Sequence, residues 1–201
     1  MSRPATQSIH DRIRITSIKV LSDDWSVLKK TTFDYRRRDG TWQSLTRETY
    51  DRGNGAVVLL YNRQAGTVVL IRQFRLPAYV NGHPEPLIEA PAGRLDDDDP
   101  EACARKETEE ETGYRVGSLR RVFDAFMSPG SITERLAFFV AAYDPAQRAA
   151  AGGGDVTEGE DIEVIEPTLD EALAMIARGE IADGKTIMLL QYAKLHRLTE
   201  P

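Results

Sequence analysis

Two apolar runs that lie close together place the strongest limit on the fold of this chain. Residues 56–61 read AVVLLY, residues 67–74 read TVVLIRQF, and the polar segment NRQAG connects them. Runs of this length, rich in valine, leucine and isoleucine, are typical of strands that are covered on both faces. The connection is short and contains glycine, as hairpin loops often do. We therefore predict a hairpin of two buried strands.

Three earlier segments alternate in the manner of strands and are separated by turn signals at 22–24 and 39–40. They are residues 14–21, 27–35 and 42–50. This pattern predicts an N-terminal antiparallel β unit, which we assign to residues 1–52, with a second domain at 53–201.

The second domain mixes strands and helices. Four further strands are expected, at 86–93, 122–127, 136–143 and 162–167. A polar, glycine-rich loop is expected at 145–160. Thr168 and Glu171 form a capping box that opens a helix reaching Gly179, and Asp183 caps a last helix through Leu195. Strands interleaved with helices predict an α/β domain, a mixed sheet sandwiched between helices.

One of the helices is strongly acidic. Asp99 before Pro100 is a helix N-cap followed by proline at the first helical position, and Gly113 ends the helix. Within it, Glu107, Glu110 and Glu111 stand at i, i+3 and i+4 and share one face. Because like charges at these spacings repel, a hard divalent cation with oxygen ligands is the natural counter-charge. The alternative is a solvated acidic face, the common outcome for a run of charges.

Composition excludes several classes of function. The net charge of −6 argues against a nucleic-acid partner, because phosphate backbones need a basic surface. The three histidines, His10, His83 and His196, lack metal-ligand spacing, so a zinc site is not expected.

Cellular location can be addressed from the same sequence. Cys103 is the single cysteine, which fits a reducing compartment. No apolar signal region and no run near 18 apolar residues is found, so we expect a cytoplasmic protein without a membrane partner.

The segment from Gly93 to Tyr114 resembles the Nudix box, G-x5-E-x7-R-E-U-x-E-E-x-G-U, where U is aliphatic or aromatic. Asp99 stands for the first glutamate of that pattern. Lys106 stands for the arginine, with one fewer intervening residue, and lysine lacks the planar fork of arginine. The acidic core of the box is intact.

The resemblance extends to DRGNGAVVLLYN, TVVLIRQFR, MSPGxxTE, AGGG followed by EDIEV, and GEIxDGKT. Together these segments look like the GDP-sugar branch of the Nudix hydrolases. The resemblance implies an α/β/α Nudix sandwich after an N-terminal β domain. It also implies a homodimer whose β domain contributes to the partner's site. The implied reaction is Mg²⁺-dependent cleavage of a nucleoside diphosphate sugar, here GDP-mannose to GMP and mannose 1-phosphate.

Site residues carry over by position. The implied Mg²⁺ ligands are the Ala92 carbonyl, Glu107, Glu111 and Glu160, and Glu110 is a further ligand or a member of the water network. Glu134 is expected to contact the substrate and is the candidate general base. The expected substrate-binding residues are Trp25, Thr46, Arg47, Glu48, Arg75, Ala92, Gly93, Arg94, Glu134, Glu160 and Lys185.

Several of these residues have a plain structural interpretation as well. Glu134 could cap a nearby element and Glu160 could be a solvated loop charge. Arg75 and Lys185 could be exposed cations. Trp25 could be a core residue.

The function itself has alternatives. An ADP-ribose or ADP-sugar pyrophosphatase would use the same box and dimer. A nucleotide-sugar sensor without turnover would explain the altered box residues Asp99 and Lys106. A glutamate such as Glu48 could accept hydrogen bonds from guanine, which favours a GDP-sugar.

Overall fold

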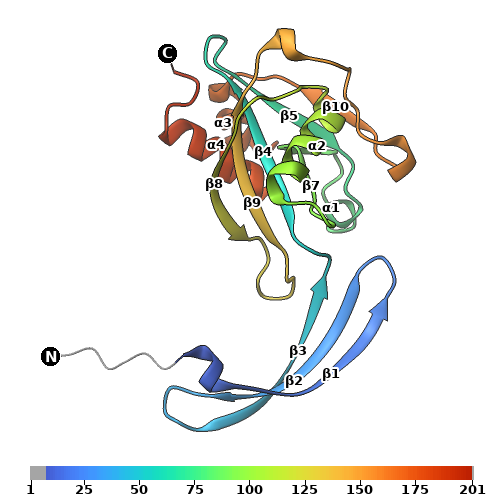
Figure 1. The fold of residues 1–201 in the computed structure, drawn as a ribbon, viewed down its shortest axis with the longest axis vertical. Coiled ribbons are helices and arrows are strands. Elements are labelled where there is room, and N and C mark those ends of the chain that lie inside the picture. The colour runs from blue at the N-terminus through green and yellow to red at the C-terminus, as the bar shows by residue number, and fades with distance from the viewer. Residues whose placement is uncertain (1–7, 201) are drawn as a thin grey trace, which may run out of the picture. The chain divides into compact units, whose positions relative to one another are not determined.

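The structure is a computed structural model that describes residues 8–200 (Figure 1). The chain divides into two compact units. The N-terminal unit extends to Gly53 and also contains Ser128–Glu134, and the second unit contains Asn54–Met127 and the chain from Arg135 onward.

The N-terminal unit is a three-stranded antiparallel sheet. A short 3-10 helix, η1 (Ile9–Arg12), leads into β1 (Ile13–Asp23), which pairs with β2 (Val27–Arg36), and β2 pairs with β3 (Trp42–Asp51). The segment 128–134 joins this unit through Tyr50, whose N–H donates to the Ser131 carbonyl and whose carbonyl accepts from Thr133 N. The predicted antiparallel β unit is confirmed.

The second unit is built on a mixed sheet. The hairpin of β4 (Gly55–Asn62) and β5 (Thr67–Gln73) is confirmed, with Leu60 opposite Val69. The strand order is β10-β5-β4-β9-β8, with β9 (Arg135–Ala142) parallel to β4. β8 (Leu119–Phe126) and β10 (Ile162–Ile165) are antiparallel edge strands. Among the described strand pairs of this second unit, only β4 with β9 is parallel.

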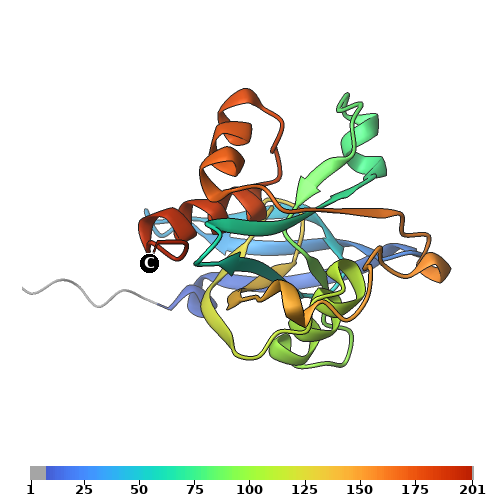
Figure 2. The same ribbon diagram turned by 90° about the horizontal axis from the view of Figure 1, so that it is seen from above.

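Helices cover both faces of this sheet. Figure 2 shows α2 (Pro100–Thr112) on one side, and α3 (Leu169–Arg178) and α4 (Gly184–Leu195) on the other. Alternate residues of β4 enter the two cores, because side chains of a strand point to opposite faces. Val57 and Leu59 join the core with α3 and α4, while Val58 and Leu60 join the core with α2. The predicted sheet between helices is confirmed.

Some local details differ from the predictions. The single strand expected at 86–93 is two strands: β6 (Leu87–Glu89) pairs with β5, and β7 (Ala92–Arg94) pairs with β4. The strand is interrupted at Ala90–Pro91. A five-residue helix, α1 (Leu76–Val80), was not predicted. The loop at 145–160 contains two 3-10 turns, η2 (Pro145–Gln147) and η3 (Val156–Glu158).

The helices are short. Within residues 8–200, none has both the length and the apolar character needed to span a membrane.

Candidate active site

Helix α2 presents the acidic residues. Asp99 caps its start by accepting hydrogen bonds from the N–H groups of Glu101 (2.9 Å) and Ala102 (3.2 Å). Gly113 ends it in the left-handed conformation, φ 75°, which favours glycine. The buried side of the helix carries Cys103, Ala104, Thr108, Glu111 and Thr112. The caps and this packed side fix which glutamate turns toward the sheet.

The three glutamates of the box lie in different surroundings. Glu111 is buried, 1% exposed, and accepts a hydrogen bond from the Ala92 N–H at 3.0 Å. Glu107 is half-buried, and Glu110 is exposed and pairs with Lys106 at 3.7 Å. Glu111 and Glu107 therefore line the inner side of the helix, whereas the side chain of Glu110 lies outside.

Strand β7 meets α2 at Gly93. A Cβ atom placed on Gly93 would lie 2.0 Å from Cδ of Glu107. Because real side chains do not approach so closely, only glycine leaves room for Glu107 at this point of the strand. The Ala92–Gly93 backbone and the two inner glutamates thus form one compact group.

The surroundings of Glu111 disfavour the charged form of its carboxyl group. Burial raises the pKa of the Glu111 carboxyl well above its usual value, the Ala92 N–H opposes this, and the charges of Glu107 and Glu160 raise it further. Glu107 and Glu160 thus both act on Glu111 across this site. A bound cation would relieve that repulsion.

Glu160 reaches the same region from the loop after η3. Its Oε1 accepts from Gln73 Nε2 at 3.3 Å and its Oε2 accepts from Asp155 N at 2.9 Å. Gly154 gives it space, since a Cβ there would lie 2.3 Å from Glu160 Oε2. Gln73 is a residue that the sequence did not single out.

The donor set fits a hard divalent cation such as Mg²⁺. Oxygen atoms alone are offered, from Glu107, Glu111, Glu160 and the backbone of Ala92, and hard cations prefer oxygen. The Oε1 atom of Gln73 is a further oxygen, buried without a hydrogen-bond partner in the described structure. Across residues 8–200, no three His, Cys, Asp or Glu side chains already stand at metal-binding geometry.

A cationic group lies in the same unit. Arg75, at the N-cap of α1, forms two hydrogen bonds to Glu89, from Nε at 2.9 Å and from its terminal nitrogen at 3.2 Å. Lys185, in the first turn of α4, contacts the same carboxylate. Neither cation is merely exposed, since their side chains are 37% and 13% accessible. The structure thus brings Arg75 and Lys185 together.

Glu89 was missed from the sequence. It is an acid inside the short apolar strand LIE, 2% exposed. A carboxylate at a position expected to be buried must be paired, which was the available signal. Arg94, by contrast, is exposed and contacts Asp96 at 3.3 Å.

The remaining predicted residues belong to the N-terminal unit. Trp25 is 83% exposed, so it is not a core residue of the chain as described. Thr46 and Arg47 are exposed on β3, and Glu48 lies opposite Lys30 of β2. Glu134 is also in this unit, 3.4 Å from Arg52 Nε, with its side chain 14% accessible.

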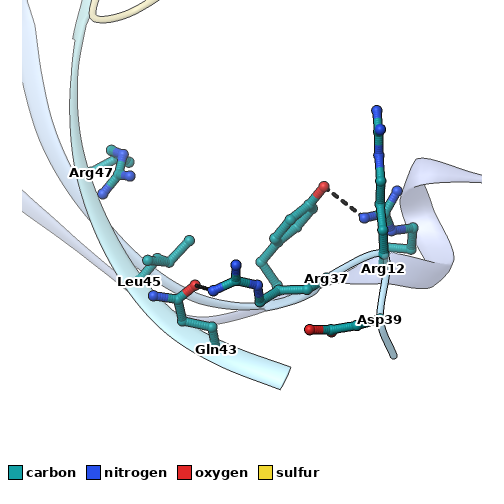
Figure 3. Close-up of a pocket in the computed structure, with 8 residues that line it drawn as sticks. Arg12, Arg37, Asp39, Gln43, Leu45 and Arg47 are labelled. Carbon is teal, nitrogen blue, oxygen red and sulfur yellow. Dashed lines mark hydrogen bonds between the residues drawn. The ribbon is translucent and has the colours of Figure 1, made fainter. Parts of the chain in front are cut away.

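Arg47 lines a pocket of about 580 Å³ on the N-terminal sheet (Figure 3). The other lining residues are Arg12, Tyr35, Arg37, Arg38, Asp39, Gln43 and Leu45. Arg12 donates to the Tyr35 hydroxyl at 2.8 Å and Arg37 donates to Gln43 Oε1 at 3.3 Å. Four arginines against one aspartate make this pocket attractive to anions.

Comparison with known proteins agrees with these features. Residues 12–50 match the family model described as "GDP-mannose pyrophosphatase NudK N-terminal domain", and residues 51–190 match the NUDIX domain model. A protein of Citrobacter koseri named GDP-mannose pyrophosphatase is 56% identical over 182 residues, which is 90% of this chain and 94% of the relative. Proteins of the same name from Pectobacterium atrosepticum and Yersinia pestis are 56% and 54% identical, over 90% and 92% of this chain and 93% of each relative.

The NUDIX model covers the mixed sheet, the acidic helix α2 and the Arg75–Glu89–Lys185 group, and the other model covers the three-stranded sheet. With both matched in order along one chain, and with relatives more than half identical over most of its length, this protein belongs to the Nudix hydrolase family, in the branch that carries the NudK-type N-terminal domain.

Proposed function

We propose that the protein hydrolyses the diphosphate bond of a nucleoside diphosphate sugar, GDP-mannose, in a Mg²⁺-dependent reaction. Water adds to one phosphorus, the P–O–P bridge breaks, and the products are GMP and mannose 1-phosphate. The observation that carries the proposal is the similarity, over 90% of the chain, to proteins named GDP-mannose pyrophosphatase.

The site chemistry supports cleavage of a diphosphate. Glu107, Glu111, Glu160 and the Ala92 carbonyl would hold Mg²⁺, which when bound neutralises phosphate charge and activates water. Arg75 and Lys185 donate to diphosphate oxygens, where negative charge develops. Gly93 and Arg94 meet the phosphates from β7. Glu110 belongs to the water network at the edge of the helix.

Glu134 is the proposed base and substrate contact. A carboxylate can accept the proton of the attacking water. Its side chain forms an ion pair with Arg52, 3.4 Å away.

A homodimer is part of the proposal, and the surface of β1 supports it. Ile13, Ile15, Ile18 and Val20 are 37–61% exposed. Their partners on β2 are every second residue of that strand: Tyr35, Phe33, Thr31 and Lys29. The four side chains therefore share one face, since a β-bulge at Thr16 offsets the odd spacing between Ile15 and Ile18. An exposed apolar row of this kind marks an interaction site.

In the proposed dimer the N-terminal sheet also contributes residues to the partner's site. Arg47 lies on the face of the isoleucine row, because Thr31 pairs with both Ile18 and Arg47, whereas Thr46 and Glu48 lie on the opposite face. Trp25, Thr46, Arg47 and Glu48 are all exposed and offer a stacking surface, a cation and a carboxylate. These groups suit a guanine base and its ribose, with Glu48 accepting from the guanine edge. We place the protein in the cytoplasm, since its one cysteine, Cys103, is buried and free.

The test is release of the two monophosphates from GDP-mannose, ADP-ribose and ADP-glucose, each with Mg²⁺ and with chelator. GDP-mannose is expected to turn over fastest, with activity lost in chelator. Faster turnover of ADP-ribose than of GDP-mannose would contradict GDP-mannose as the substrate and indicate an ADP-ribose pyrophosphatase. Tight binding of a nucleotide sugar without hydrolysis would indicate a sensor.

A substitution addresses the metal assignment directly. Glu111→Gln keeps the shape and the bond from Ala92 N–H but removes the charge, so kcat with GDP-mannose should fall about 100- to 1,000-fold while the protein stays folded. Glu109→Gln is the matched control, because Glu109 lies on the same helix and contacts Arg115 at 2.8 Å. Near-normal activity of Glu111→Gln would contradict the assignment of Glu111 as a metal ligand.

A further inference from the structure

Among residues 8–200, Glu89 is the one carboxylate with contacts to two of the proposed substrate-binding cations. Its Oε1 accepts from Arg75 Nε, and its Oε2 accepts both from the terminal nitrogen of Arg75 and from Lys185 Nζ. Arg75 precedes α1 and Lys185 opens α4, so the cations come from elements far apart in sequence. One buried side chain therefore sets the separation of two distant positive charges.

A second chain of contacts fixes Lys185 from the other side. Lys185 Nζ lies 3.1 Å from Asp183, and the same aspartate accepts from Thr186 N at 3.0 Å and Thr186 Oγ1 at 2.6 Å. Thr186 Oγ1 accepts in turn from Ala90 N at 2.7 Å. Because Ala90 directly follows Glu89, the contacts close a ring between β6 and the start of α4.

Both cations keep donors for a further ligand. A guanidinium has five N–H groups and an ammonium has three. Glu89 uses two of the five on Arg75, and Glu89 with Asp183 uses two of the three on Lys185. The group of two cations and two carboxylates is neutral, so it lacks a net charge of its own to attract an anion. What it provides is a fixed geometry.

The cationic group lies within electrostatic range of the acidic one. Burial lowers the pKa of Arg75, but the bonds and charge of Glu89 outweigh it, and the charges of Glu111 and Glu160 raise it further. Arg75 is therefore influenced by the same carboxylates that are proposed to hold the metal.

We propose that Glu89 is a positioning residue for the reaction: it holds Arg75 and Lys185 at the spacing that a diphosphate bridging the metal site requires. The inference rests on the proposed function. A buried ion pair adds little stability over an apolar replacement, whereas fixed donors around a reacting phosphorus increase the rate of the chemical step.

The test is a pair of double-mutant cycles with GDP-mannose, combining Glu89→Gln with Arg75→Ala and with Lys185→Met. Glu89→Gln alone is expected to lower kcat/KM about 10- to 100-fold, in the range for residues that orient a direct contact. If Glu89 acts through the cations, the same substitution should cost much less where a cation is already absent. The proposal is overturned if Glu89→Gln lowers kcat/KM by the same factor in the Arg75→Ala and Lys185→Met variants as in the wild type. It is also overturned if Glu89→Gln alone has a normal kcat/KM.

Glu166→Gln is the matched control for a structural effect. Glu166 also accepts two hydrogen bonds from within the fold, from Tyr114 OH at 2.7 Å and Tyr143 OH at 3.1 Å. Glu166→Gln should lower the free energy of unfolding. It should leave kcat/KM unchanged once the measured value is corrected for the fraction of folded protein. An equal loss of kcat/KM in Glu166→Gln would make Glu89 a structural residue.

Two further measurements keep the outcome decisive. If Glu89→Gln does not fold, Glu89→Asp replaces it, because the shorter side chain keeps the charge but cannot reach both cations. If the wild type hydrolyses a different nucleotide sugar, the cycles use that substrate, and if it hydrolyses none, they use the affinity for inorganic pyrophosphate. Failure of the GDP-mannose assignment and failure of the role of Glu89 are thus separate results.

Discussion

Gly93 has no side chain because Glu107 occupies the space that one would fill. An alanine Cβ would lie 2.0 Å from Glu107 Cδ and 2.4 Å from its Cγ. Both atoms belong to a flexible side chain that can move aside, and Gly93 is not among the glycines with positive φ. We predict that Gly93→Ala displaces Glu107, lowers kcat/KM about 10- to 100-fold, and changes the urea midpoint little.

The matched control for this prediction is Gly117→Ala. Apart from Gly117 itself and its chain neighbours, no heavy atom of residues 8–200 lies within 4 Å of a Cβ placed there, and its φ is not positive either. Activity and stability should both stay at the wild-type level. A Gly93→Ala variant with full activity would show that the position of Glu107 does not matter for turnover.

The ionisation of Glu89 predicts how stability depends on pH. Burial would raise the pKa of Glu89, but Lys185 and Arg75 outweigh it and lower the pKa below 4.5. A carboxyl with a lowered folded-state pKa stabilises the protein above its unfolded pKa and loses that effect as the pH falls through the folded value. Glu89→Gln removes this contribution and leaves two cations without their shared partner.

We therefore expect Glu89→Gln to be less stable than the wild type by about 3–5 kcal/mol at pH 7. The difference should stay constant down to the unfolded pKa of 4.5 and shrink at lower pH. Urea unfolding of both proteins from pH 7 to pH 3 measures it. A difference that is the same at pH 3 as at pH 7 would contradict the charged pairing of Glu89.

Residue spacing predicted part of the site. Glu107 and Glu111 stand one helical turn apart, which is visible in the sequence and gave the acidic face. The burial of Glu111 and the exposure of Glu110 were not visible, because they depend on where the sheet lies against the helix. Glu89 and Lys185 are 96 residues apart, and no local pattern reveals so distant a contact.

At the scale of elements, the caps of α2 account for one departure from the Nudix box. Asp99 stands where the pattern has glutamate, and it accepts from the N–H groups of Glu101 and Ala102. Aspartate is a favoured N-cap, because its short side chain reaches the first free N–H groups of a helix. The departure thus has a structural reason.

We predict that Asp99→Ala lowers the free energy of unfolding by about 1 kcal/mol. Asp99→Asn keeps an acceptor oxygen and should stay close to the wild type. Urea unfolding at constant pH compares the three proteins, and kcat/KM should change little in either variant. Equal stability of Asp99→Ala and the wild type would mean that the cap does not stabilise α2.

Elements with long periodic patterns were predicted well and short ones were not. The hairpin β4–β5 and the helices α2, α3 and α4 follow from apolar runs and caps, and Thr168 accepts from Glu171 N at 3.1 Å as its capping box predicts. The break at Ala90–Pro91 and the short helix α1 depend on tertiary pairing. β6 and β7 each have three residues and pair with different strands, which no sequence window shows.

For the whole molecule, the apolar row on β1 determines the proposed assembly. Ile15 and Ile18 are 61% and 60% exposed and lie on the same face of the N-terminal sheet. Burial of such side chains against a second copy contributes about 25 cal/mol for each Å² of apolar surface removed from water. Lysines at these positions would place two charges in that interface.

We predict that Ile15→Lys combined with Ile18→Lys converts a wild-type dimer into a monomer, as measured by light scattering after size-exclusion chromatography. The control is Ser17→Lys combined with Ser22→Lys, which adds the same charge to the opposite face, since Ser17 and Ser22 pair with Thr32 and Leu28. The control should remain dimeric. If Trp25 and Arg47 act in the partner's site, the monomer should also lose GDP-mannose hydrolysis. A monomeric wild type would contradict the assembly, and a fully active monomer would contradict the cross-subunit roles.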